Sequence, residues 1–106
     1  MSLTVKQEEQ ASTIILKIKG VLDITTSHVI EPYLEKIDND IKILILDLTE
    51  LEFIDSTGIG SIMNAIYLSQ EKNIQLKLQG VNELTHHVFE TVGLYQILET
   101  IQGEIH

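Results

Sequence analysis

The residues best placed for chemistry lie in one short turn at residues 55–60, whose sequence is DSTGIG. The turn follows the apolar segment 44–48 and precedes apolar residues at helical spacing, namely Ile59, Ile62, Met63 and Ile66. Asp and Ser are favoured at helix N-termini, and Gly58 and Gly60 leave the first turn bare. The pattern therefore predicts that a strand delivers the Ser56 hydroxyl, exposed, to the positive end of a helix dipole.

Several catalytic motifs built around a serine or glycines fail at this turn. A nucleophile elbow needs a glycine two residues before its serine, where this chain has Ile54. A nucleotide-phosphate loop needs a Lys-Ser/Thr pair, which is absent, and Met63 stands where a dinucleotide fingerprint has its third glycine. No catalytic residue is predicted. The alternative is that Asp55, Ser56 and Gly58 only begin a helix.

The predicted helix after the turn has an outer face that is small and uncharged. If its apolar residues face the core, then Thr57, Ser61, Asn64 and Leu68 point outward and Gly60 lies on the flank. We interpret this face as a docking surface with an exposed leucine at its far end. No basic residue occurs between Lys42 and Lys72, so a phosphate on Ser56 would meet no side-chain cation.

Composition limits the classes of function. The 106 residues suit a single domain spanning 1–106, and the absence of cysteine excludes disulfides and thiolate metal sites. The chain has 7 basic residues, all lysine, and 16 acidic ones, so its net charge is −9. This charge argues against nucleic acid as a partner and favours a basic surface on another protein. The alternative is that the acidic residues only maintain solubility. Without a signal peptide or an apolar run of about 20 residues, we expect a cytoplasmic protein with no direct membrane contact.

We expect no metal and no cofactor. Adjacent His86 and His87 point about 100° apart on a helix and cannot chelate one ion together. His28 is interpreted as a surface or structural residue, and the carboxylates of Glu50, Glu52 and Asp55 are not predicted to converge on a cation.

Periodicity predicts two strands, a helix, a strand, a helix, a strand and a helix, in that order. Strands are expected at residues 3–7, at 14–19 ended by Gly20, at 41–48, and at 74–79 ended by Gly80. The nearly all-apolar segment 41–48 suggests a central parallel strand covered by helices on both faces.

Helices are expected at about 25–38, at 56–72, and after Asn82. The first contains Pro32, so either its first turn is loose or the regular helix begins later. The third is expected to bury Leu84, Val88, Phe89 and Val92 and to end at Gly93 in a left-handed conformation, while segment 94–98 stays unassigned. The prediction is an α/β domain with a mixed, mostly parallel sheet of four to five strands and about four helices.

These segments together resemble a STAS domain of the anti-sigma factor antagonist family. The resemblance rests on the GVLD sequence at residues 20–23, the strand 44–48 and the DSTGIG turn, and it extends through the VGL turn at 92–94. It implies a small cytosolic bacterial protein that binds an ATP-dependent serine kinase, which also sequesters a sigma factor. That kinase phosphorylates the serine of an Asp-Ser-Ser/Thr-Gly turn, and a metal-dependent phosphatase restores it.

The resemblance makes Ser56 the phosphoacceptor, Asp55 its turn partner, and Thr57 and Gly58 the rest of the recognition turn. It also places Asp23 in the neighbouring loop of the interface, to which the helix face adds Gly60, Ser61 and Asn64. Val21 and Pro32 depart from the family pattern. The alternatives are a STAS protein with another output, such as a subunit regulating a transport complex, a nucleotide-binding module, and a permanently docked scaffold.

Overall fold

Five strands form one mixed sheet in the computed structural model, which describes residues 2–102. The strands are β1 (Leu3–Gln10), β2 (Thr13–Leu22), β3 (Ile43–Asp47), β4 (Leu51–Ile54) and β5 (Gln75–Gln79). Four of them lie in the order β1-β2-β3-β5. The fifth, β4, pairs with the last residues of β2, beyond the part of β2 that pairs with β3. Only β1 is antiparallel to its neighbour; all other pairs are parallel.

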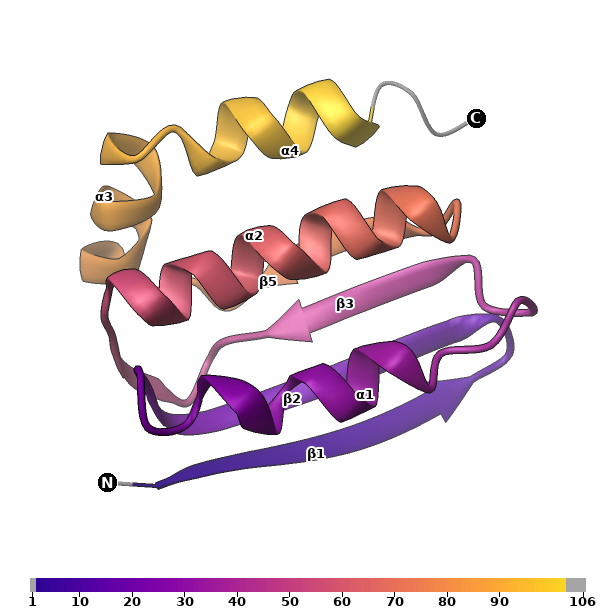
Figure 1. Cartoon of the computed structure of the whole chain (residues 1–106), viewed down its shortest axis with the longest axis horizontal. Coiled ribbons are helices and arrows are strands. Elements are labelled where there is room, and N and C mark those ends of the chain that lie inside the picture. The colour runs from indigo at the N-terminus through magenta and orange to yellow at the C-terminus, as the bar shows by residue number, and fades with distance from the viewer. Residues whose placement is uncertain (1, 103–106) are drawn as a thin grey trace.

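Four α-helices and one 3₁₀ helix complete the described chain (Figure 1). They are the 3₁₀ helix η1 (Ser27–Val29), α1 (Glu31–Glu35), α2 (Ser56–Glu71), α3 (Glu83–Thr91) and α4 (Leu94–Gln102). The predicted α/β class, the mostly parallel sheet and the number of helices are confirmed. The unassigned segment 94–98 begins α4, and β4 occupies a stretch in which no strand was predicted.

One predicted boundary was wrong, and for the first helix the alternative that the regular helix begins later is confirmed. Gly20 does not end β2, which continues to Leu22 because the Gly20 amide donates to the Glu50 carbonyl at 3.1 Å as β2 changes partner from β3 to β4. The regular helix α1 begins only at Glu31, with Pro32 in its first turn, where a missing N–H costs nothing. The preceding residues form a turn and η1 instead.

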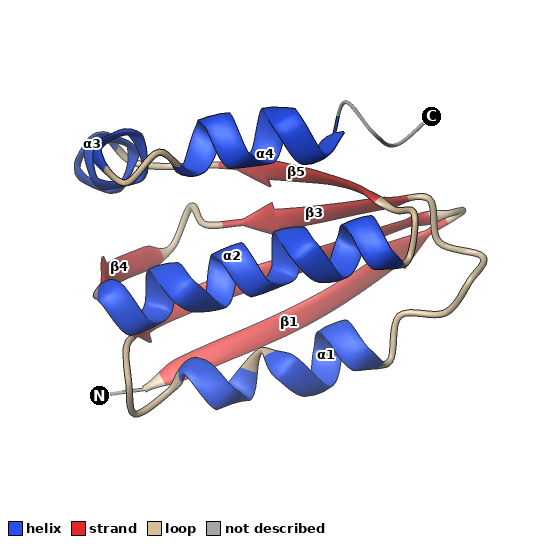
Figure 2. Ribbon diagram, turned by 45° about the horizontal axis from the view of Figure 1, so that its top comes forward, coloured by secondary structure: helices blue, strands red, loops and turns tan. Residues whose placement is uncertain are grey.

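The helices α1, α2 and α4 lie on the same side of the sheet (Figures 1 and 2). Burial alternates accordingly: Leu44 and Leu46 of β3 are buried, whereas Ile43 and Ile45 are half-buried. The expectation that β3 is covered by helices on both faces was therefore wrong. We call the uncovered side the helix-free face; it carries Thr4, Lys6, Glu8, Ile15, Lys17, Lys19, Ile43, Ile45, Asp47, Gln75, Lys77 and Gln79.

The helix α3 closes one end of the core mainly with Phe89. Phe89 is fully buried, and Thr85, one turn earlier, is buried with it. Leu84 and Val92 were predicted to be core residues, but they are 73% and 43% exposed, because a helix at the margin of the layer buries only a narrow stripe. Two local predictions are confirmed: the Asn82 side chain caps α3 by accepting from the Thr85 amide at 2.8 Å, and Gly93 has φ +76°.

The C-terminal ends of α1 and α2 are tied together. The Lys72 ammonium donates to the carbonyls of Ile37 at 2.8 Å and Glu35 at 3.3 Å, which are groups that a helix end leaves without a partner. At the other side of α1, the Tyr33 hydroxyl donates to the Val5 carbonyl at 3.3 Å. These contacts fix α1 between the sheet edge and α2.

None of the helices among residues 2–102 is both long enough and apolar enough to cross a bilayer.

The contrast between two apolar residues of α3 gives a stability prediction. Phe89→Ala should lower the free energy of unfolding by about 3–5 kcal/mol, because it empties a fully buried position. Leu84→Ala, on the same helix, should change it by less than about 0.5 kcal/mol. Urea unfolding followed by circular dichroism measures both, and equal losses would contradict the burial described for α3.

Candidate functional site

The turn that carries Ser56 lies where β2 and β4 end. Leu22 and Ile54 are partners in the parallel ladder, so the residues that follow them, Asp23 and Asp55, leave the sheet at the same edge. The Asp55 amide donates to the Leu22 carbonyl at 3.2 Å. Two of the predicted site residues, far apart in sequence, therefore belong to adjacent loops.

Asp55 is the N-cap of α2. Its backbone is extended, and its carboxylate accepts a hydrogen bond from the Gly58 amide at 2.9 Å, which satisfies one of the free amides of the first helical turn. Ser56 is the first helical residue and its side chain is exposed, as predicted. The cap is thus made by Asp55, which leaves the Ser56 hydroxyl at the surface.

Gly58 allows the helix to approach the sheet. A Cβ at this position would lie 2.3 Å from the Leu22 carbonyl oxygen and 2.7 Å from Cγ1 of Ile54, so no larger residue fits without movement of the backbone. Gly60, two residues later, is exposed and has nothing within 4 Å of such a Cβ. The two glycines of the turn therefore have different roles: one is required by packing, and the other leaves a bare surface.

The loop after β2 is organised by Asp23 and Thr26. The Asp23 carboxylate accepts from the Thr25 hydroxyl at 2.6 Å and from the Thr25 amide at 2.9 Å, and its carbonyl accepts from the Ser27 amide at 2.8 Å. The buried Thr26 hydroxyl donates to the Val21 carbonyl at 2.8 Å. The bond from the Thr25 hydroxyl holds the pKa of Asp23 below its ordinary value.

A groove separates α2 from η1 and α1. It has a volume of about 260 Å³, and we call it the α1–α2 groove. Ile30 and Leu34 are buried beneath it. One wall comes from α2 and consists of Thr57, Gly60, Ser61 and Asn64. The other wall comes from η1 and α1 and consists of Ser27, His28 and Glu31.

The structure brings the predicted docking residues of α2 together on one wall of this groove, but it changes the outline of the surface. Asn64 and Gly60 are exposed, and Thr57 and Ser61 are half-buried. Leu68 is half-buried against the core, so the expected exposed leucine at the far end was wrong; α2 turns Tyr67 outward there instead, 49% exposed.

Sequence reasoning missed the second wall of the groove. His28 was interpreted as a surface or structural residue, Ser27 was considered only as a candidate helix cap, and Glu31 was not singled out, yet all three line the groove. Ile24, beside Asp23, is 73% exposed and was also missed. The position of Pro32 was the available signal, since it requires the preceding residues to leave the regular helix and form the separate segment that makes this wall.

The charge around the turn is negative. Asp23, Glu31 and Asp55 lie in or beside the groove, and no lysine lines it. Within residues 2–102 no cluster of His, Asp and Glu could hold a metal ion. The arrangement offers an accessible hydroxyl next to a groove, which suits covalent modification and protein docking.

Comparison with known proteins gives a consistent assignment. The family model described as STAS domain matches residues 4–106. An anti-sigma-B factor antagonist from Listeria monocytogenes is 29% identical over 109 residues, covering 99% of this chain and 94% of the relative.

Two solved structures share the fold. An anti-sigma factor antagonist from Mycobacterium paratuberculosis has a TM-score of 0.75 at 19% identity, covering 98% of this chain and 94% of that one. A sulfate transporter family protein from Wolinella succinogenes has a TM-score of 0.77 at 20% identity, covering 84% and 73%.

The two glycines of the turn should respond oppositely to alanine. Gly58→Ala should lower the free energy of unfolding by about 1–3 kcal/mol, since its Cβ collides with the Leu22 carbonyl. Gly60→Ala should raise it by up to about 1 kcal/mol, because alanine favours the helix and meets nothing there. Urea unfolding of the two variants checks this, and a destabilised Gly60→Ala would refute the open surface described at that residue.

Removing the Thr25 hydroxyl should make the free energy of unfolding less dependent on pH in the acid range. The pKa of Asp23 is lower in the folded chain than in the unfolded chain. Ionised Asp23 therefore stabilises the fold fully at pH values above the unfolded-state pKa, and this stabilisation is lost as the pH falls through the folded-state pKa. Thr25→Val should raise the Asp23 pKa and lower stability at neutral pH, with the difference from wild type closing in acid. Carboxyl NMR titration and urea midpoints across pH measure both effects; Thr91→Val is the control, and an unchanged Asp23 pKa in Thr25→Val would contradict the assignment.

Proposed function

Because the chain belongs to the STAS domain family, we propose that it is a phosphorylation-controlled anti-sigma factor antagonist of the bacterial cytoplasm, with residues 1–106 forming one STAS domain. In its unphosphorylated form it binds an anti-sigma factor that is also a serine kinase, and the bound sigma factor is released. Phosphorylation of Ser56 abolishes binding, and a phosphatase reverses it. The observation that carries this proposal is the exposed Ser56 hydroxyl in the first turn of α2, directly before Thr57, which lines the α1–α2 groove.

Ser56 suits the role of phosphoacceptor because modifying it leaves the turn intact. The N-cap bond comes from Asp55, so a phosphate on the neighbouring hydroxyl does not remove it. A helix N-terminus also tolerates added negative charge. Thr57 is half-buried against the groove, which favours Ser56 over Thr57 as the modified residue.

The effect of the phosphate falls on the partner surface. It adds a charge of about −1.5 to −2 beside Asp23 and Asp55, at a groove that no lysine lines. A partner group packed against the bare hydroxyl is then displaced or left facing excess negative charge. A loss of about 3 kcal/mol would weaken docking more than 100-fold, since each 1.4 kcal/mol is a factor of ten.

The proposed docking surface combines the turn at residues 55–58 with Asp23 of the loop after β2 and with the α2 wall of the groove. It comprises Asp23, Asp55, Ser56, Thr57, Gly58, Gly60, Ser61 and Asn64. The net charge of −9 would assist encounter with a basic partner surface. The name of the Listeria monocytogenes relative, an anti-sigma-B factor antagonist that aligns over nearly its whole length, supports an anti-sigma factor as that partner.

The proposal predicts opposite behaviour for two substitutions of one residue. Ser56→Ala should capture the anti-sigma factor kinase from a lysate of the native host and carry no phosphate, because the acceptor is gone and the groove is unchanged. Ser56→Asp should bind at least about 100-fold more weakly than Ser56→Ala, since it places a permanent charge at the turn. Intact mass and pull-down, followed by titration against the captured kinase, measure both.

Gln96→Glu is the matched control, because it adds one negative charge near the start of α4, another helix N-terminus. It should bind like wild type. A phosphate on wild type that persists in Ser56→Ala, or a change below threefold in Ser56→Asp, would refute the switch. If all variants capture a transporter or the same unrelated proteins, the domain regulates a transport complex or serves as a scaffold instead, and saturable nucleotide binding would favour the nucleotide-binding alternative.

A further inference from the structure

The helix-free face has an ordered arrangement of charge that the Ser56 site does not use. The strand register places side chains in rows across the sheet: one row is Glu8, Ile15, Ile45 and Lys77, and the next is Lys6, Lys17, Asp47 and Gln79. Each row therefore has an acidic group on one side of the boundary between β2 and β3 and a basic group on the other. The isoleucines at the centre of the first row are half-buried.

We propose that two copies of this chain associate through their helix-free faces, about a two-fold axis that runs parallel to the strands between β2 and β3.

Such an axis makes the face complementary to itself. It lays β1 over β5 of the second copy and β2 over β3 of the second copy, with each row kept at the same height. Glu8 then faces Lys77 of the second copy, Lys17 faces Asp47 of the second copy, and Ile15 meets Ile45 of the second copy. Each of these contacts occurs twice, and aligned packing of two sheets is a common arrangement.

An axis perpendicular to the strands gives a poor match. Placed midway between the two rows, it would lay the first row over the second, so that Ile15 would cover Lys17 of the second copy and Ile45 would cover Asp47 of the second copy. Both contacts would cover a charged group with an apolar side chain of the second copy, whereas the axis parallel to the strands places an opposite charge over each of these two groups. The distribution of residues therefore selects one of the two simple ways of stacking the sheets.

The overall charge of the chain also favours this face. Four of its 7 basic residues are here (Lys6, Lys17, Lys19 and Lys77), in a chain with a net charge of −9. With the carboxylates of Glu8, Asp47 and Glu50 beside them, the face is close to neutral. Two copies can meet here without the repulsion that the rest of their surfaces would impose.

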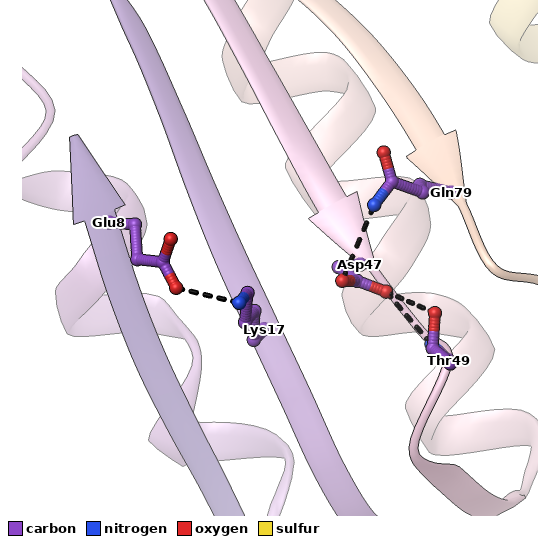
Figure 3. Close-up of polar contacts among 5 residues, drawn as sticks. All are labelled: Glu8, Lys17, Asp47, Thr49 and Gln79. Atoms are coloured by element: carbon purple, nitrogen blue, oxygen red, sulfur yellow. Dashed lines mark hydrogen bonds and ion pairs between the residues drawn. The ribbon is translucent and has the colours of Figure 1, made fainter. Parts of the chain in front are cut away.

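Three charged groups of the face, those of Glu8, Lys17 and Asp47, are already held in place (Figure 3). The Lys17 ammonium lies 2.7 Å from the Glu8 carboxylate. The Asp47 carboxylate accepts from the Thr49 hydroxyl at 2.6 Å and from the Gln79 amide at 3.4 Å, and the Thr49 bond keeps the pKa of Asp47 low. Asp47 is thus ionised and oriented when the second copy arrives.

The size of the face is sufficient. The chain measures 33 × 27 × 20 Å, and the sheet lies across the two longer dimensions (Figure 1). Stable interfaces take about 800 Å² from each partner, which is within the reach of such a face. Because α2 lies on the other side of the sheet, both Ser56 turns stay outside the interface.

The test is sedimentation equilibrium of the full chain and three variants. Wild type should reach the mass of a dimer. Lys77→Glu should weaken association at least about tenfold, because the new carboxylate of each copy would face the Glu8 carboxylate of the other copy. The double variant Glu8→Lys, Lys77→Glu should recover association relative to Lys77→Glu, since the exchanged charges again face each other.

Lys36→Glu is the matched control: it makes the same change of charge on an exposed residue at the end of α1, outside the face, and should dimerise like wild type. A wild-type chain that stays monomeric up to about 1 mM would overturn the proposal. So would equal weakening by Lys36→Glu and Lys77→Glu, or a double variant that associates no better than Lys77→Glu.

Discussion

The contact between the Gly58 backbone and the Leu22 carbonyl determines how the rest of the molecule is arranged. With only 2.3 Å between that oxygen and an ideal Cβ at residue 58, the start of α2 rests on the end of β2 with no side chain between them. The short strand β4 makes this approach possible, because its ladder with β2 brings Ile54 beside Leu22 immediately before the turn. The position of α2 over the sheet, the width of the groove and the exposure of Ser56 all follow from this contact.

The sheet separates two kinds of surface. Its covered face is built from alternate residues of β2 and β3 and packs against α2, and its uncovered face carries lysines and carboxylates at the positions between them. The residues that we propose to bind a regulator and those that we propose to bind a second copy therefore lie on opposite sides of one layer of backbone. A change on one side leaves the other side's contacts in place.

Local signals in the sequence were sufficient for the turn but not for its surroundings. Asp55, Asn82 and Gly93 were assigned correctly because capping and left-handed backbone depend on a few neighbouring residues. The strand β4 was missed because four residues carry too little periodicity, and Leu84 was misplaced because the width of the buried stripe of α3 depends on what packs against it. The wall formed by Ser27, His28 and Glu31 depends on the docking of α1 beside α2; Pro32 indicated only that the regular helix begins late, not where it docks. The apolar run of β3 suggested two covered faces because half-buried isoleucines resemble core residues in a sequence.

The bonds from Lys72 to the carbonyls of Glu35, the last residue of α1, and of Ile37, just after it, have a consequence for recognition. They hold one end of the α1–α2 groove, while the Gly58 contact holds the other, so the two walls keep their spacing before any partner arrives. A partner that docks there pays little conformational entropy on this side of the interface. For the partner that we propose, association would then be governed by diffusion and charge rather than by a slow rearrangement, and the lifetime of the complex would depend on the fit at Ser56.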